Sequence, residues 1–406
     1  MSTHASAPSL SIVIPAYNEE EGIAAIIERT LAAREVIRAG SGISQVEVIV
    51  VNDGSSDRTA EIARRYSELR LITYEKNRGY GAAIKQGFEA ATGDLLGFLD
   101  ADGTCDPAFF VSLTNVLLEE NADVVIGSRL GEESEMPRVR RIGNRIFAGI
   151  IGLWGGTKVT DSASGMRVLR RTSLSRLYPL PDGMHFTPAM SSLAIFDPHL
   201  KLIEVPMQYR ERTGESKLRV IGDGLRFLRT IIDTALTYRP LRLFGLVGIG
   251  LLLFALGYGT YPVLFYLRER YIEEWMIYRL VAVAVGITAG VNLVAVGVLG
   301  QQMVALIHED FGPPSALRTV LHRVLLRYLI PWGILAILGG VVLNWGGILE
   351  YVRTGHVTSH WIYIITGGLL VTLGVEFVSF GVLARVLRIL EFRRRFRSAE
   401  RVSSGP

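Results

Sequence analysis

The stretch Leu95-Leu96-Gly97-Phe98-Leu99-Asp100-Ala101-Asp102 decides the fold, because a short apolar run ends directly in two carboxylates. A run of this length, bounded by Gly and Asp, predicts a strand buried on both faces of a parallel sheet. Open α/β sheets bind their ligands at the carboxyl ends of the strands, where this Asp pair is expected. Two carboxylates separated by one small residue can share a hard cation and present it to a diphosphate. For this motif alone, a solvated Asp-rich turn is the alternative.

Further apolar runs indicate that this strand belongs to a larger sheet. Helical stretches such as 81–91 lie between the runs, and this alternation predicts a doubly wound, mostly parallel α/β sheet. A helix over 60–66 is expected after the second run, with Ser55 or Ser56 as its cap. The other predicted strands cover 10–15, 46–51, 69–74 and 124–127.

Four motifs, in this order, resemble those of family 2 glycosyltransferases with the GT-A fold. Three later motifs resemble more specifically the dolichol-phosphate mannose and polyprenyl-phosphate glucose synthases. All of them lie before the long apolar segments. The first four are Ile14-Pro15-Ala16-Tyr17-Asn18-Glu19, Val51-Asn52-Asp53-Gly54-Ser55-Ser56-Asp57, Asn77-Arg78-Gly79 and Asp100-Ala101-Asp102, and the later three are Gly127-Ser128-Arg129, Ser164-Gly165-Met166-Arg167 and Gly214-Glu215-Ser216-Lys217-Leu218.

The resemblance implies a metal site, a donor site and a set of catalytic residues. A divalent cation, Mg²⁺ or Mn²⁺, is expected on Asp100, Asp102 and Thr104, although relatives often carry Gln at the position of Thr104. The expected catalytic residues are Asp100, Asp102 and Arg129. The nucleotide-sugar donor is expected to contact Pro15, Ala16, Tyr17, Glu19, Asp53, Gly79, Ala101 and Asp102.

A lipid phosphate acceptor would need cationic side chains more than a strong base. Its phosphate is largely ionised at neutral pH, with a second pKa of about 6 by analogy with phosphorylated side chains. Arg is well suited to hold such a dianion. His185 is expected to contact a sugar hydroxyl. The acceptor candidates are Arg129, Arg141, Arg145, Arg212 and Lys217, and for the Arg group around Arg141 a solvated surface position is the alternative.

The second half of the chain predicts an integral membrane domain. Hydrophobic residues make up 49% of the sequence and the mean hydropathy is +0.31. Segments 243–267, 280–307, 328–349 and 361–384 are long enough to cross a bilayer, which takes about 20 residues. Basic residues before the first segment, between the second and third, and after the fourth place both termini in the cytoplasm. No signal peptide is expected before the first strand.

The predicted organisation is a cytoplasmic GT-A domain over 1–217, an amphipathic helix region over 218–240, and an all-α membrane domain of four transmembrane helices over 241–406. The helix region is expected at the membrane surface, or else packed on the catalytic domain. Gly286 and Gly290 are either a close helix contact or incidental. Glu376 is either functional or hydrogen-bonded to a neighbouring helix. No internal repeat is expected.

The sequence argues against several other classes of protein, among them dehydrogenases and ATPases. A phosphate-binding Gly-Lys-Ser/Thr loop is absent from the sequence, Ile84 breaks a dinucleotide fingerprint, and one Cys builds no thiolate cluster. The net charge of +4 requires no nucleic acid. No Trp follows an Arg, so the Gln-x-x-Arg-Trp motif that processive polysaccharide synthases usually carry is missing. A transporter or an inactive binding module is disfavoured by the few polar residues in the apolar segments and by the intact Asp pair.

The expected function is an inverting transfer of a hexose from GDP-mannose or UDP-glucose to a dolichyl or undecaprenyl phosphate. UDP-N-acetylglucosamine is the alternative donor, and a processive polysaccharide synthase is the alternative enzyme. The expected partners are therefore the nucleotide sugar, the polyprenyl phosphate and the membrane. Self-association into a homo-oligomer is left open.

Overall fold

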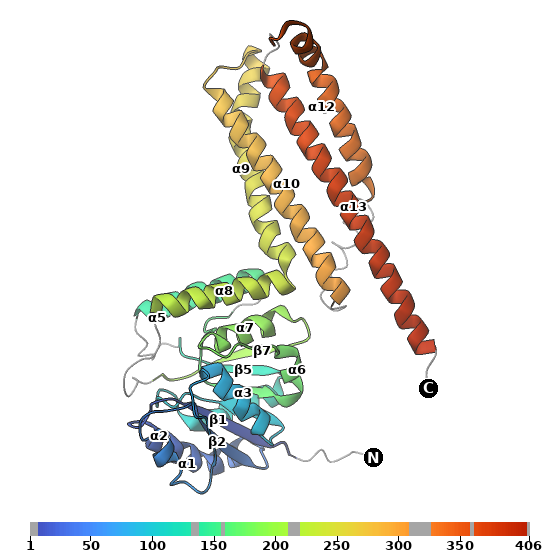
Figure 1. Ribbon diagram of the computed structural model, residues 1–406. Helices are drawn as coiled ribbons and strands as arrows, with labels where there is room; N and C mark the ends of the chain where they lie inside the picture. Colours follow the sequence, from blue (N-terminus) through green and yellow to red (C-terminus); the bar gives the residue numbers. More distant parts are fainter. Residues whose placement is uncertain are drawn as a thin grey trace. The chain divides into compact units, whose positions relative to one another are not determined.

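The computed structural model describes residues 7–130, 138–155, 159–209, 220–307, 326–357 and 361–403. The chain divides into two compact units, Met1–Ala235 and Leu236–Pro406, which Figure 1 shows in blue to green and in yellow to red.

The first unit is built on a seven-stranded sheet with the order β3-β2-β1-β4-β6-β5-β7. Neighbouring strands are parallel except at β6, which runs antiparallel to both β4 and β5. The five predicted strands are confirmed, and the mostly parallel GT-A-like sheet is confirmed with them. They are β1 Leu10–Ala16, β2 Val46–Asn52, β3 Arg70–Thr73, β4 Leu95–Phe98 and β5 Val124–Ser128, to which the structure adds β6 Arg167–Arg170 and β7 Leu202–Pro206.

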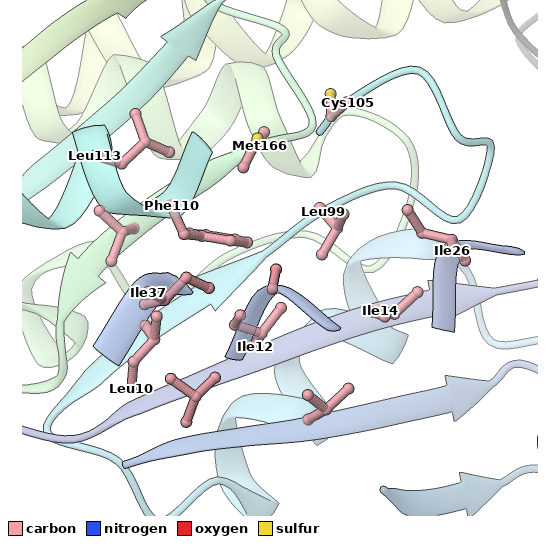
Figure 2. Close-up of a cluster of buried hydrophobic side chains, with 14 of the residues drawn as sticks. Leu10, Ile12, Ile14, Ile26, Ile37, Leu99, Cys105, Phe110, Leu113 and Met166 are labelled. Carbon is pink, nitrogen blue, oxygen red and sulfur yellow. The ribbon is translucent and has the colours of Figure 1, made fainter. Parts of the chain in front are cut away.

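Helices cover both faces of this sheet. On one face, α1 Ile23–Ser41 and α4 Phe110–Glu119 pack against alternate residues of β1 such as Ile12, forming the core in Figure 2. On the other face, α3 Tyr80–Ala90 comes so close to β1 that a Cβ at Gly87 would lie 2.3 Å from Val13 Cγ1. Further helices of this unit are α2 Thr59–Ala63, α5 Arg138–Gly155, α6 Leu174–Leu177 and α7 Phe186–Phe196, and α8 Val220–Tyr238 begins in it and runs past its end at Ala235.

The predicted cap of the helix after β2 is wrong. α2 begins at Thr59, the side chain of its N-cap residue Arg58 does not cap it, and Asp57 Oδ1 accepts the Thr59 N–H at 3.0 Å. Ser55 and Ser56 instead bond to Asn18 in the loop after β1. A loop-to-loop contact therefore outcompetes the local cap that the composition favours.

Helix α8 packs against α5. The rings of Phe147 and Phe227 lie 6.0 Å apart in an edge-to-face arrangement, and Ile231 is fully buried. Leu225, on another side of the helix, stays 64% exposed. The structure thus shows α8 packed on α5, the alternative position, whereas contact with a membrane surface stays a prediction.

Within its described residues, the second unit contains four long helices: α9 Pro240–Glu269, α10 Met276–Ile307, α12 Leu326–Thr354 and α13 Trp361–Ser403. In the part of the chain that the structure describes, four helices are long and apolar enough to cross a membrane, as predicted. α9 pairs with α10 and α12 with α13 as two antiparallel hairpins (Figure 1). Of the two alternatives for Gly286 and Gly290, the structure shows a close helix contact at Gly290, because a Cβ there would lie 2.9 Å from the Gly248 carbonyl oxygen.

Candidate active site

The loops after β1 and β2 are joined into one surface at the carboxyl edge of the sheet. Asn18 adopts a left-handed conformation with φ 52°, and its backbone N–H donates to Ser55 Oγ at 2.9 Å. The Ser56 N–H donates to Asn18 Oδ1 at 2.8 Å, and the Glu19 N–H donates to Thr59 Oγ1 at 2.8 Å. The predicted donor residues Pro15, Ala16, Tyr17 and Glu19 lie at this junction, and Tyr17 is exposed.

Asp53 is buried and shapes the next loop. Its two carboxylate oxygens accept the backbone N–H groups of Arg78 and Gly79 at 2.7 and 2.8 Å. Gly79 has φ 108°, and a Cβ there would lie 2.5 Å from the Asp182 carbonyl oxygen, so the position requires glycine. The structure thus places Asp53 and Gly79 at the start of α3, while their contact with a nucleotide stays a prediction.

Asp100 follows β4 and is held from two sides. The Tyr80 hydroxyl, at the start of α3, donates to Asp100 Oδ1 at 2.6 Å. On the other side, a Cβ at Gly165 would lie 1.8 Å from Asp100 Oδ2, so the carboxylate occupies the space that any side chain there would need. Burial, followed by the charge of Asp100, raises the pKa of Tyr80 well above its ordinary value. Tyr80 therefore stays a hydrogen-bond donor to Asp100 at neutral pH.

Asp102 is buried, and Thr104 positions it. The Thr104 hydroxyl donates to Asp102 Oδ1 at 2.7 Å, and its backbone N–H donates to the same oxygen at 3.2 Å. Arg29 of α1 then secures the following turn through the carbonyls of Gly103 and Cys105, at 3.2 and 3.1 Å. Burial, followed by the charge of Asp100, raises the pKa of the Cys105 thiol to about 12, so the thiol is neutral.

The carboxylate oxygens of Asp100 and Asp102 are ligands of the kind that a hard divalent cation prefers. Within the described residues no group of three or more His, Cys, Asp and Glu side chains gathers, so the protein offers the two carboxylates of Asp100 and Asp102. Mg²⁺ is commonly bound by one or two carboxylates and completed by substrate phosphates and water. Ala101 lies between the two and is buried. The role of Thr104 as a third metal ligand stays a prediction. Its hydroxyl donates a hydrogen bond to Asp102.

Arg129 is engaged in a buried ion pair. Its Nε and Nη2 donate to the two oxygens of Asp161, each at 2.8 Å, and Asn144 Nδ2 donates to Asp161 Oδ1 at 2.6 Å. Burial alone would raise the pKa of Asp161, but the Arg129 guanidinium and these hydrogen bonds outweigh it and lower that pKa. The Arg129 side chain is only 15% exposed. The pair therefore fastens the 160–165 loop to the end of β5, and a catalytic or acceptor role for Arg129 stays a prediction.

A second arginine, Arg167 of β6, is fully buried beneath the same loop. Its guanidinium donates to the carbonyls of Ser164 and Ser162 at 3.0 and 2.8 Å, and to Ser191 Oγ at 2.9 Å. Burial lowers the pKa of Arg167 to about 10, so it is still a cation at neutral pH. The loop that presents Gly165 to Asp100 thus rests on a buried positive charge.

The remaining acceptor candidates are spread over α5 and the region before α8. Arg141 is partly buried and Arg145 is exposed, both on α5. Arg212 and Lys217 lie outside the described residues. His185 directly precedes α7, and burial, followed by the charge of Arg226, lowers its pKa. The sugar contact expected for His185 stays a prediction.

Reasoning from the sequence misses four residues of the site: Tyr80, Asp161, Gly165 and Arg167. Two of them, Gly165 and Arg167, belong to the quoted Ser-Gly-Met-Arg motif, and Tyr80 follows the Asn-Arg-Gly motif. Those motifs were available as signals, but the contacts with Asp100 cross between elements far apart in sequence. Asp161 lies in the polar stretch Thr160-Asp161-Ser162, which an ordinary turn would also explain.

Comparison with known proteins identifies the family. The family model for Glycosyl transferase family 2 matches residues 11–178. The undecaprenyl-phosphate 4-deoxy-4-formamido-L-arabinose transferase of Yersinia pestis is 31% identical over 312 residues, which cover 74% of this chain and 90% of that protein. This chain is a family 2 glycosyltransferase. A second family model, for a domain of unknown function, matches residues 240–398 of the glycosyltransferase.

Two further relatives come from Haloferax volcanii. Its dolichyl-phosphate hexose transferase is 33% identical over 236 residues, or 57% of this chain and 95% of that protein. Its low-salt glycan biosynthesis hexosyltransferase Agl6 is 36% identical over 250 residues, and the match spans 60% of this chain and 57% of that relative. Among solved structures, glucosyl-3-phosphoglycerate synthase of Mycobacterium tuberculosis is 23% identical with a TM-score of 0.46, covering 56% of this chain and 79% of that one.

Proposed function

We propose that this glycosyltransferase transfers a hexose, with inversion, from GDP-mannose or UDP-glucose to a polyprenyl phosphate. The observation that carries the proposal is the presence, in one chain, of the positioned Asp100–Asp102 pair and four helices able to cross a membrane. The names of the relatives support it, because they specify transfer to undecaprenyl phosphate or dolichyl phosphate. UDP-N-acetylglucosamine is the alternative donor.

On the donor side, we assign Asp100 and Asp102 to a divalent cation, Mg²⁺ or Mn²⁺, on the diphosphate. When bound, the cation would neutralise charge that develops on the departing diphosphate. Tyr80 and Gly165 fix Asp100, and Thr104 fixes Asp102, so both carboxylates are oriented before the donor arrives. The nucleoside would lie on the joined loops after β1 and β2, next to Tyr17.

On the acceptor side, α5 and α8 carry large apolar side chains that are exposed at the surface of the unit. Ile142 and Ile146 are 59% and 55% exposed, and Leu225 of α8 is 64% exposed. Exposed apolar helix faces with basic residues are typical of helices that lie in a membrane interface. Arg145 is exposed next to Ile146, so it is our first candidate to bind the lipid phosphate, with Arg141 beside it. Arg212 and Lys217 stay candidates.

The reaction needs no strong general base. An ionised oxygen of the lipid phosphate forms a bond to the anomeric carbon of the sugar, while the bond from that carbon to the donor diphosphate breaks. The products are a polyprenyl-phosphate sugar and a nucleoside diphosphate. We place the catalytic unit and both termini in the cytoplasm, as the basic flanks indicate. Reporters fused after Pro406 and inserted near Gly355 should then be active on opposite faces.

An assay of the purified full-length protein tests the proposal. The protein is given GDP-mannose, UDP-glucose, UDP-N-acetylglucosamine and a nucleotide-linked 4-deoxy-4-formamido-L-arabinose in turn, each with a short-chain polyprenyl phosphate. We expect one lipid-linked monosaccharide from one of the first two donors. Better transfer to free sugars, or products that grow by repeated addition, would contradict the proposal, and the second result would favour a processive synthase.

The acceptor assignment has its own test. Arg145→Met should raise the KM for polyprenyl phosphate or lower kcat, with an expected loss of about 1.5–3 kcal/mol in kcat/KM. Donor binding measured without lipid should be unchanged. Arg65→Met is the matched control, because Arg65 is an exposed arginine paired with Glu61 on α2. Loss of donor binding in the Arg145 variant would instead place Arg145 at the donor diphosphate.

A further inference from the structure

The two hairpins of the membrane unit share a sequence pattern. Residues 288–299 of α10 read Thr-Ala-Gly-Val-Asn-Leu-Val-Ala-Val-Gly-Val-Leu, and residues 372–383 of α13 read Thr-Leu-Gly-Val-Glu-Phe-Val-Ser-Phe-Gly-Val-Leu. Seven of these twelve positions are identical. The first helices of the hairpins also correspond, with identical pairs at Leu241 and Leu326, Arg242 and Arg327, Gly248 and Gly333, Ile249 and Ile334, Leu264 and Leu349, Tyr266 and Tyr351, and Arg268 and Arg353.

Matched positions also make matched contacts. A Cβ at Gly248 would lie 2.8 Å from the Gly290 carbonyl oxygen, and a Cβ at Gly333 would lie 2.7 Å from the Gly374 carbonyl oxygen. Any two apolar helices share composition, but they do not for that reason share backbone contacts at equivalent residues. These matches argue against the expectation that the chain holds no internal repeat.

Asn292 and Glu376 are equivalent residues of the two copies, and they bond to each other. They are 84 positions apart, and Asn292 Nδ2 donates to Glu376 Oε1 at 3.2 Å. α10 and α13 run in the same direction (Figure 1), so the copies are parallel repeats. A contact between equivalent residues of two parallel repeats lies on the axis that relates them. A cavity of about 630 Å³ adjoins Asn292 and is lined by further matched pairs, Thr288 with Thr372 and Val285 with Leu369.

We infer that the membrane unit is a tandem duplication of one helical hairpin, and that the Asn292–Glu376 hydrogen bond on its pseudo-two-fold axis sets how the two hairpins pair. Shape alone specifies this pairing poorly, because apolar side chains gain little by leaving lipid for one another. A polar side chain in an apolar layer must instead find a partner at one register. The two copies differ at this position so that an amide donor meets a carboxyl acceptor.

Cysteine cross-linking of the full-length protein in membrane vesicles tests the inference. Val285→Cys and Leu369→Cys together place one thiol from each copy at the cavity, and the native Cys105 is buried. Bifunctional thiol reagents of graded length should then join the two within one chain. Glu376→Leu in this background should lower the cross-linking yield about threefold to tenfold. Glu376→Gln, which keeps the acceptor oxygen, should restore it.

An exchange of residues tests the symmetry. Asn292→Glu combined with Glu376→Asn should cross-link like the parent, because donor and acceptor only change places across the axis. Asn292→Leu combined with Leu293→Asn keeps the composition but turns the amide about 100° around the helix. Its cross-linking yield should therefore be as low as that of Glu376→Leu. Thr288→Val is the matched control, because the Thr288 hydroxyl donates to Ala284 of its own helix. An unchanged yield in Glu376→Leu would refute the pairing role, and an exchange variant no better than Glu376→Leu would refute the axis.

Discussion

In the catalytic unit, Asp53, Asp102 and Asp161 are buried, and each accepts hydrogen bonds from donors in another loop or in the adjacent turn. In the membrane unit, by contrast, the helices of each hairpin meet where glycine lets one backbone touch the other, as at Gly248 and Gly290. The first arrangement holds buried charged groups in fixed orientations within the loops of the sheet domain. The close backbone contacts of the second arrangement hold helices together in a lipid bilayer, where no hydrophobic force acts between them. Hydrogen-bonded carboxylates thus organise the unit expected in water, and close backbone packing organises the unit expected in lipid.

The largest expected effect in the catalytic unit comes from a change at the proposed metal site. Asp102→Asn should reduce turnover by several orders of magnitude, because charge on the departing diphosphate loses its counterion. Circular dichroism and the unfolding temperature should stay close to those of the parent. A chelator should abolish turnover in the parent, and Mg²⁺ or Mn²⁺ should restore it. Asp106→Asn is the control, and near-parental turnover in Asp102→Asn would exclude the metal assignment.

The second break removes the buried ion pair. Asp161→Asn should lower the free energy of unfolding by about 3–5 kcal/mol, because Arg129 loses its charged partner while staying buried. The lowered pKa of Asp161 makes its contribution complete above the unfolded-state pKa and lost as the pH falls through the folded-state value. Parent and variant should therefore converge in stability on acidification.

Urea titrations at several pH values measure both effects. Glu61→Gln, which breaks an exposed pair with Arg65, is the control and should cost at most about 0.5 kcal/mol. A constant gap between parent and Asp161→Asn down to acidic pH would show that the ion pair is not its cause.

The third change moves Asp100, the proposed metal ligand, without changing its chemistry. Gly165→Ala adds one methyl group where Asp100 lies, so the carboxylate must shift. Misplacement of a reacting group by about 1 Å can cost about 10²-fold in rate. We expect a loss of that order in kcat/KM and a higher metal concentration for half-activation. Gly149→Ala in α5 adds the same group to open space, and an equal loss in that control would undermine the interpretation.

The smallest expected effect comes from the membrane unit. Gly248→Ala places a methyl group against the Gly290 carbonyl and should cost about 1–3 kcal/mol of stability, measured by thermal unfolding in detergent. Gly250→Ala, on the same helix but facing open space, should be neutral or slightly stabilising. Gly333→Ala should match Gly248→Ala if the hairpins are copies. Equal behaviour of Gly248→Ala and Gly250→Ala would show that close backbone packing does not hold the hairpin.

Sequence patterns predict a structural element correctly where the element is uniformly apolar or carries one of the quoted motifs. The parallel strands and the four long helices are of this kind. β6 reads Arg-Val-Leu-Arg, and a strand with a fully buried Arg167 contradicts the usual exposure of arginine. The ligand role of Thr104 and the acceptor role of Arg129 were inferred from position, whereas the structure shows which atoms they bond. The contact of Arg129 with Asp161 joins two loops that are distant in sequence, and such a contact leaves no local pattern.

The hairpin architecture has an evolutionary consequence. A unit with an even number of crossings begins and ends on one side of the bilayer, so a second copy joined in tandem enters with the same orientation. Neither copy then has to reverse its charge bias, as an odd-numbered unit would after duplication. The ancestral gene segment could thus double in a single event, and later drift of one copy at position 292 or 376 would turn two like residues into a complementary pair.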